Sequence, residues 1–161
     1  MKPDKQHPAT MEGLVKVTFD LPNKDGRIAS ESLWAEPVGD NSYRLRNVPF
    51  FIYGYSEQDI IRAEASESKL TVRGIVERGG HSTYRIFLAE QTTEEQFNKD
   101  WVPLGELGCS YERASQRLIA VDVPPHANVY AVYDVLQNDE KDPLWEFEEG
   151  HCGHPLRQTF R

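Results

Sequence analysis

The first half of the chain alternates hydrophobic and polar residues. The run LVKVTFDL over residues 14–21 places apolar side chains at every second position, and this period of two puts one kind of side chain on each face of a strand. Further short runs of this type follow as far as residue 80, with Gly, Pro, Asn and Asp between them, as turns require. We therefore predict that residues 14–80 form a β-rich half, either a small β-barrel or a bent antiparallel sheet.

The pattern becomes helical in the second half. Thr93 and Gln96 have the spacing of a capping box, and apolar residues recur at helical intervals from Phe97 onward. Pro103 lies inside this pattern and predicts a kink or a division of the helix. A second helical pattern covers residues 129–136, where apolar residues again fall on one face.

From residue 81, strand and helix patterns follow the order strand, helix, strand, strand, helix, strand. This βαββαβ order is that of the ferredoxin-like, split βαβ arrangement. The predicted fold class is therefore α+β, a small β-barrel-like or bent antiparallel sheet followed by a ferredoxin-like half. The expected parts are a disordered leader (1–13), the β-rich half (14–80), the ferredoxin-like half (81–149) and a flexible tail (150–161).

The two halves meet in the segment VERGGHSTYRIFL, residues 76–88. Gly79-Gly80 between two alternating runs predicts a β-hairpin, because its tight turn needs positive φ angles that glycine adopts freely. Alternation then divides the side chains of the second strand between two faces. The face expected in the core holds Ser82, Tyr84, Ile86 and Leu88, and the opposite face holds His81, Thr83, Arg85 and Phe87.

The second of these faces is a candidate anion-binding row. Neighbouring side chains on it stand about 7 Å apart, and an arginine offers a planar fork of donors to a carboxylate or phosphate. The alternative is an ordinary solvated face of a half-buried sheet. If the barrel opens beside this row, Glu36 and Asp59 would approach Arg85. The candidate ligand- or partner-binding residues are His81, Ser82, Thr83, Arg85, Trp34, Glu36, Asn47 and Asp59.

Four residues of the first half also have structural interpretations. Trp34 and Phe50 are expected in the core, as large apolar residues usually are. Asn47, which precedes Val-Pro, is expected to form a turn. Asp59 is expected to cap the entry to the following strand through local bonds from its side chain to the backbone.

The net charge of −8 limits the partners. It disfavours nucleic acid and anionic membranes, because phosphate neutralisation needs clustered Lys and Arg. An acidic segment near the C-terminus supplies most of this charge, and it serves either as a solvated face or as a docking surface for a basic protein. The acidic docking candidates are Asp139, Glu140, Asp142, Glu146, Glu148 and Glu149.

Sequence patterns predict no metal and no cofactor. His151, Cys152 and His154 are zinc-type ligands, but their spacing is too tight for a zinc finger, and a flexible tail explains them better. Cys109 follows a helix-ending glycine, where a buried, unreactive thiol is expected. Two cysteines cannot form a disulfide framework, which favours a reducing, cytoplasmic location. The first residues lack a secretory signal pattern, and the chain has no apolar run long enough for a membrane helix.

Several motifs occur in a characteristic order, namely ESLWAEPVGDNSYRLRNVPF, DIIRAEA, ERGGHSTYRIF, LGCSYE and AVDVPP. This ordered set resembles a bacterial family known only as a domain of unknown function. The resemblance covers about residues 14–149 and leaves out the tail after Gly150. It implies a bacterial cytoplasmic protein and implies no activity. The matching positions include Trp34, Glu36, Asn47, Pro49, Asp59, Gly80, His81, Ser82, Thr83 and Arg85.

Three functions remain open. The leading hypothesis is a non-enzymatic protein that binds a basic protein, such as an immunity or antitoxin-like inhibitor that covers a toxin's active site. The second is a sensing module in which His81, Thr83 and Arg85 hold a small anion, an expectation that rests on fold analogy. The third is an enzyme with His81 as acid or base and Arg85 as anion holder. It ranks last, because no partner carboxylate lies at a defined spacing.

Overall fold

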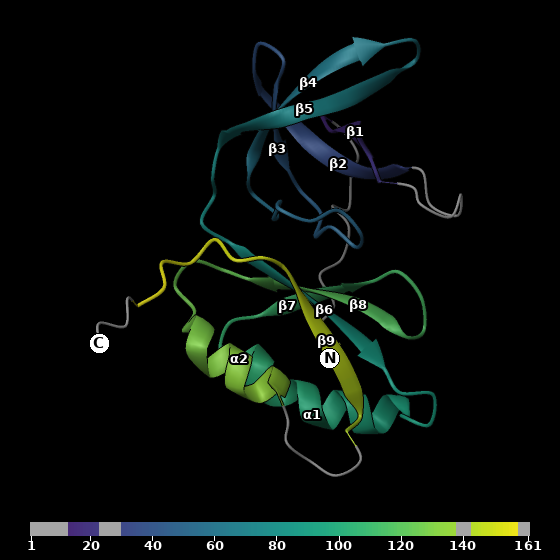
Figure 1. Cartoon of the computed structure of the whole chain (residues 1–161), viewed down its shortest axis with the longest axis vertical. Coiled ribbons are helices and arrows are strands. Elements are labelled where there is room, and N and C mark those ends of the chain that lie inside the picture. Colours follow the sequence, from purple (N-terminus) through teal and green to yellow (C-terminus); the bar gives the residue numbers. More distant parts are fainter. Residues whose placement is uncertain (1–12, 23–29, 138–142, 158–161) are drawn as a thin grey trace.

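Five strands of the N-terminal half close into a barrel in the computed structural model, which describes residues 13–22, 30–137 and 143–157. Strand β1 pairs antiparallel with β2 and parallel with β5, so the sheet returns to its first strand (Figure 1). Inward-facing apolar residues of the alternating runs fill the barrel. Its strands are β1 (Val15–Asp20), β2 (Ser30–Gly39), β3 (Ser42–Leu45), β4 (Ile60–Ser66) and β5 (Lys69–Glu77).

The C-terminal half is a sheet with two helices on one face, and the barrel lies over its other face (Figure 1). In the described residues the strand order is β7-β8-β6-β9, and every neighbouring pair is antiparallel. The described chain is thus mostly β with two helices, in agreement with the predicted α+β class. The elements are β6 (Ser82–Leu88), α1 (Glu94–Glu106), β7 (Ser110–Arg113), β8 (Leu118–Val123), α2 (Val129–Gln137) and β9 (Trp145–His151).

The predicted start of the first helix is confirmed. Thr93 is the N-cap of α1, and its capping box with Gln96 is complete. The predicted division at Pro103 is wrong, because α1 continues through this residue to Glu106 and accepts the loss of one backbone N–H donor. On the predicted apolar face of α2, Val129, Val132 and Leu136 are buried, whereas Tyr133 is 44% exposed and packs edge-on against Phe147.

Each half has its own apolar core, and Phe97, Trp101 and Tyr111 form an aromatic group at the centre of the second one. Of the large residues expected in the first core, Trp34 and Phe50 are only half-buried. The barrel core consists of Val17, Phe19, Leu33, Ala35, Leu45, Ile61 and Ala63. Two separate cores mean that contacts between the halves must come from other residues.

The predicted hairpin at Gly79-Gly80 is wrong. Strand β5 pairs with β4 and β1 inside the barrel, while β6 pairs with β8 and β9 inside the sheet. The two glycines instead carry the chain from one half to the other. Gly80 has a φ of +86°, and a Cβ at Gly79 would lie 2.6 Å from the backbone oxygen of Gln58. Glycine is needed here for a close crossing of two backbones.

The predicted flexible tail is corrected for residues 150–157. Strand β9 continues to His151, and His154 is buried. A Cβ at Gly153 would lie 2.2 Å from the backbone oxygen of His81, so glycine lets the chain pack closely on the start of β6. Residues 158–161, the rest of the tail, and residues 1–12 of the predicted leader lie outside the described residues.

Candidate functional site

Arg85 lies between the two halves, with none of its side chain exposed. Its guanidinium donates to the backbone oxygens of Pro49 (3.3 Å), Ile52 (3.0 Å) and Phe51 (3.4 Å) in the loop that follows β3. Its Nε donates to Glu148 on β9 at 3.2 Å. These bonds hold a barrel loop against the sheet, which is the ordinary use of a buried guanidinium fork.

The predicted anion-binding row is therefore covered by the barrel loop. The alternative prediction, an ordinary solvated face, is wrong for Thr83 and Arg85 for the same reason. Thr83 is fully buried, and its hydroxyl lies 2.7 Å from the hydroxyl of Ser56. Arg85 is engaged with backbone oxygens and Glu148. The reason is tertiary, since residues 46–59 lie over this face. Only Phe87, at the end of the row, stays 40% exposed.

Glu31 holds the other side of the same loop. Its carboxylate accepts hydrogen bonds from the consecutive N–H groups of Phe50 (2.6 Å), Phe51 (3.1 Å) and Ile52 (2.9 Å). The loop thus presents its N–H groups to an acidic barrel residue and its oxygens to Arg85, and both contacts are charge-assisted. Sequence reasoning missed Glu31. Its signal is a charged residue in the inward register of Leu33 and Ala35, where an apolar residue is expected.

Asn47 makes a second connection between the halves rather than a simple turn. Its side chain accepts from the N–H of Trp34 at 2.8 Å and donates to Glu112 on β7 at 3.0 Å. The other oxygen of Glu112 accepts from the N–H of Val48 at 2.9 Å. Glu112 is a further residue that the sequence did not single out.

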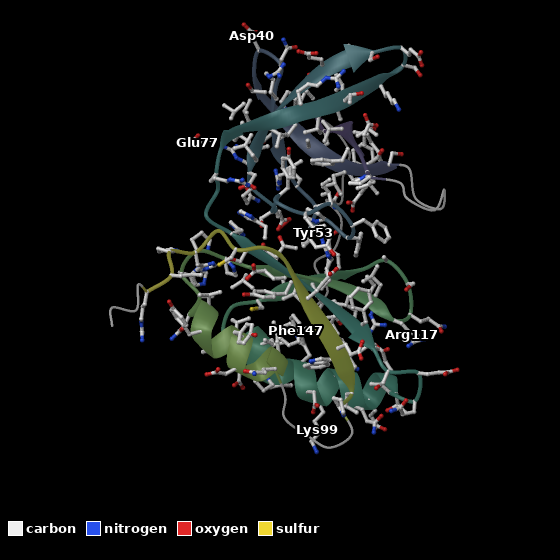
Figure 2. All side chains as sticks on the ribbon, in the orientation of Figure 1. Asp40, Tyr53, Glu77, Lys99, Arg117 and Phe147 are labelled. Carbon is white, nitrogen blue, oxygen red and sulfur yellow. The ribbon has the colours of Figure 1, made fainter. Side chains whose placement is uncertain are left out.

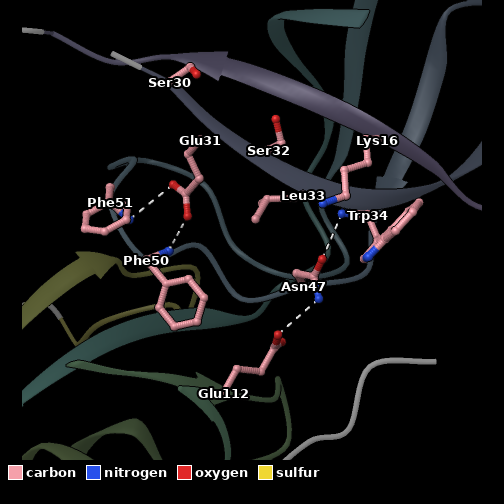
Figure 3. A pocket seen from close by; sticks show the side chains of 10 residues that line it. All are labelled: Lys16, Ser30, Glu31, Ser32, Leu33, Trp34, Asn47, Phe50, Phe51 and Glu112. Carbon is pink, nitrogen blue, oxygen red and sulfur yellow. Dashed lines mark hydrogen bonds between the residues drawn. The ribbon is translucent and has the colours of Figure 1, made fainter. Parts of the chain in front are cut away.

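A pocket of about 360 Å³ lies beside this connection (Figure 3). Both carboxylates on its wall, Glu31 and Glu112, hold loop backbone or Asn47, as the dashed lines show. The ammonium of Lys16 sits over the ring of Trp34, 4.9 Å from its centre. The two carboxylates and Asn47 of this pocket therefore bind other parts of the chain.

Asp59 and Glu36 do not approach Arg85 as expected. Asp59 accepts from the N–H of Ser56 (2.9 Å), which confirms the local cap, and it also binds Gly79 N–H and Arg78. Asp59 thus holds the crossing segment to the barrel. Glu36 pairs with Arg44 at 3.0 Å and, more loosely, with Arg46.

His81 has the carboxylate partner that the sequence did not specify. Its Nδ1 lies 2.8 Å from Asp122 on β8. Ser82 pairs with a different histidine, since its hydroxyl lies 2.6 Å from Nδ1 of His154 and accepts from the N–H groups of Gly153 and His154. Because Ser82 is buried and separate from the His81–Asp122 pair, the two pairs do not combine into a Ser-His-Asp triad. Ser82 and His154 fix residues 153–154 to β6.

The structure also bears on the expectations for the cysteines and for a metal site. Burial raises the pKa of the Cys109 thiol to about 12, so the reactive thiolate is disfavoured at neutral pH. Within the described parts of the chain, no group of three or more His, Cys, Asp or Glu side chains is placed to hold a metal ion. None of the described helices has the length and apolarity to cross a membrane.

His151 is expected to make the stability of the protein depend on pH. Burial lowers its pKa below the ordinary 6.5, Arg78 lowers it further, and the carboxylates of Asp59 and Glu149 act in the opposite direction. Because the unfolded chain binds this proton more readily, the free energy of unfolding should fall as the pH drops below 6.5. His151→Asn should lose less stability than the parent between about pH 7.5 and about pH 5 in urea unfolding. An equal loss in both proteins would contradict this role.

The acidic docking candidates divide into two sets. Asp139, Glu140 and Asp142 lie outside the described residues. Glu146 and Glu149 are exposed on β9, and Glu148 is one-third exposed and bonds Arg85. The hydroxyl of Tyr53 also donates to Glu148, at 2.5 Å, and this bond raises the pKa of Tyr53.

Exposed aromatic side chains stand beside these acids. Tyr53 is 59% exposed and covers the guanidinium of Arg85, at 4.6 Å from its ring centre. Figure 2 shows Tyr53 at the junction of the barrel and the sheet. Phe87 pairs with Glu146 in the register of β6 and β9. We call the set Phe51, Tyr53, Phe87, Glu146 and Glu148 the acidic-aromatic surface.

Comparisons with known proteins give a family and a fold. The family model described as a domain of unknown function (DUF4265) matches residues 31–147. The crystal structure of a hypothetical protein from Neisseria gonorrhoeae is similar, with a TM-score of 0.72 and 18% sequence identity. That match covers 86% of this chain and 94% of the other, and at this identity it concerns the fold. No curated protein matches the chain.

Proposed function

The chain belongs to the DUF4265 family, and we propose that it is a non-enzymatic bacterial binding protein that recognises a basic protein. Its role would resemble that of an immunity or antitoxin-like inhibitor in the cytoplasm. The observation that carries the proposal is the acidic-aromatic surface. It combines exposed carboxylates with Tyr53, Phe87 and Phe51, which are 59%, 40% and 38% exposed.

This combination suits a basic protein for two reasons. Carboxylates on an acidic molecule attract a cationic surface over a distance and speed association. Exposed aromatic rings then offer apolar contact and a face for arginine or lysine side chains. Aromatic residues are enriched in the centres of protein interfaces, whereas a purely solubilising acidic face has no need of them.

The small-anion alternative has less support. Its cationic group, Arg85, is fully buried and bonded to loop oxygens and Glu148. An anion would have to displace these bonds and leave backbone oxygens without donors, which costs free energy. We therefore propose only the protein-binding function.

We also propose a ferredoxin-like arrangement for the second half. The order βαββαβ, the antiparallel sheet order β7-β8-β6-β9 and the helices on one face support it. In this arrangement the sheet face away from the helices is free to hold another domain. Here that face receives the barrel, which places Tyr53 beside β9.

Charge reversal tests the proposed function. The full chain would capture its partner from native bacterial lysate, and the partner's identity and charge would follow from mass spectrometry. The double variant Glu146→Lys, Glu149→Lys should slow association with the purified partner by about tenfold or more at low salt. Glu148 of the acidic-aromatic surface is left intact because it holds Arg85. Glu149, its exposed neighbour on the helix side of β9, is changed in its place.

The matched control is Glu95→Lys, Glu106→Lys on α1, which changes the net charge equally at exposed positions on the far side of the sheet. Its association rate should change much less. Equal slowing by both double variants, or a captured partner that is acidic, would contradict the proposal.

A further inference from the structure

Strand β9 is an edge of the four-stranded sheet in the described part of the chain, next to β6 and with no strand beyond it (Figure 1). The barrel is closed and so has no edge to offer. An edge strand presents backbone N–H and C=O groups that another extended chain can pair with. The acidic-aromatic surface lies along this same strand.

The direction of the free backbone groups follows from two hydrogen bonds. The N–H of Leu88 donates to the backbone oxygen of Arg117 at 2.8 Å, toward β8, and the N–H of Ala89 donates to the backbone oxygen of Leu144 at 2.8 Å, toward β9. Antiparallel ladders alternate in this way from residue to residue. Backbone groups of Glu146 and Glu148 therefore face β6, and those of Trp145, Phe147 and Glu149 face outward.

The outward edge is acidic on both faces of the sheet. Glu146 and Glu148 are register partners of Phe87 and Arg85 on the barrel side, and Glu149 is the partner of Tyr84 on the helix side. The register of β6 and β9 shifts between Glu149 and His151, so the alternation ends at Gly150. This end of the edge is already covered, because the N–H of Gly54 donates to the oxygen of Gly150 at 2.9 Å. Trp145 at the other end is buried, at 4% exposure, so the open length runs from Glu146 to Glu149.

These charges decide between two occupants. A second copy of β9 would bring carboxylates opposite carboxylates, and like charges across strands destabilise the pair. An extended segment with lysine or arginine at alternate positions would instead form opposite-charge pairs with Glu146 and Glu148. Its cationic side chains would also reach the exposed ring of Tyr53.

We propose that β9 accepts an extended basic segment of a protein partner as an additional strand of the sheet. The inference rests on the proposed function and adds the mode of recognition. Backbone pairing supplies affinity and the alternating side chains supply specificity, as in other cases of strand addition.

The experiment uses the full chain and a short peptide of alternating lysine and valine as the probe. On binding, amide hydrogen exchange measured by NMR should slow at Phe147 and Glu149. The amides of Glu146 and Glu148 already face β6 and should change little. A peptide methylated on the alternate backbone nitrogens that would donate to β9 should lose affinity by a factor of about ten or more. A peptide of alternating glutamate and valine is the charge control and should not bind.

Each other outcome overturns the inference. Equal binding of the methylated peptide, or no slowing at the amides of Phe147 and Glu149, excludes strand addition. Capture of a basic partner would still support the proposed function. No binding of the lysine peptide also excludes it. Slow exchange at these amides in the concentrated protein alone would identify a second copy as the occupant. If the parent chain does not bind the lysine peptide and the variant Glu146→Lys, Glu149→Lys associates with itself, the carboxylates serve only to keep the β9 edges of two copies apart.

Discussion

Arg85→Ala is expected to lower the free energy of unfolding by about 3–5 kcal/mol, because it removes one member of a buried, charged network. The loss would leave the backbone oxygens of Pro49 and Ile52 without their donors, and it would leave Glu148 without its buried cation. It would also remove the group that Tyr53 covers. Urea unfolding of parent and variant measures the change.

Two further variants separate charge, donors and volume at this position. Arg85→Met keeps much of the length and supplies no donors, so it should remain strongly destabilised. Arg85→Lys keeps the charge without the planar fork and should fall between Met and the parent. If Arg85→Met is as stable as the parent, the hydrogen bonds to the loop contribute little.

Glu31→Ala is expected to cost about 3 kcal/mol of stability, since it leaves three consecutive N–H groups without an acceptor. Those groups belong to Phe50, Phe51 and Ile52, and Glu31 is 7% exposed. Hydrogen exchange at these three amides should speed up more than exchange elsewhere in the barrel. Urea unfolding and NMR exchange together provide the measurement.

The control for Glu31 is Glu77→Ala, a glutamate at the exposed end of β5. It should change stability by no more than about 0.5 kcal/mol. Glu31→Gln keeps one oxygen and should lose part of the stability. An effect of Glu31→Ala as small as that of Glu77→Ala would show that solvent satisfies the loop amides.

The substitutions at Arg85 and Glu31 both affect the loop that follows β3, which lies between these two opposite charges. Glu31 of the barrel binds its N–H groups, and Arg85 of the sheet binds its oxygens. Because this loop carries Tyr53, a loss of either charge should also displace part of the acidic-aromatic surface. A stability change in these variants is therefore expected to accompany weaker partner binding.

Local order was available from the sequence. The alternation over residues 14–21, the capping box at Thr93 and the burial of Val129, Val132 and Leu136 depend on neighbours within a few positions, and the structure agrees with each. The same locality explains the cap at Asp59, whose side chain binds Ser56 only three residues away. The ordered motifs also identified the family, whose model matches most of the chain.

Partners distant in sequence decided the rest. The local sequence pattern at Gly79-Gly80 is that of a hairpin. Strand pairing, however, depends on which strand edges meet in the folded chain, and β5 and β6 belong to different sheets. Arg85 alternates like a solvated residue, yet a loop more than thirty positions away covers it. Asp122 reaches His81 through the register of β6 and β8.

The sequence by itself determined the elements, the acidic character and the family of this protein, because propensity, periodicity and charge are properties of short segments. Only the tertiary structure decided that Thr83 and Arg85 of the predicted row join the two halves. It also decided that the acids of β9 stand beside Tyr53 and Phe87 at an open sheet edge. The physical reason is that burial and exposure are set by what packs against a residue, which its own neighbours in the chain do not specify.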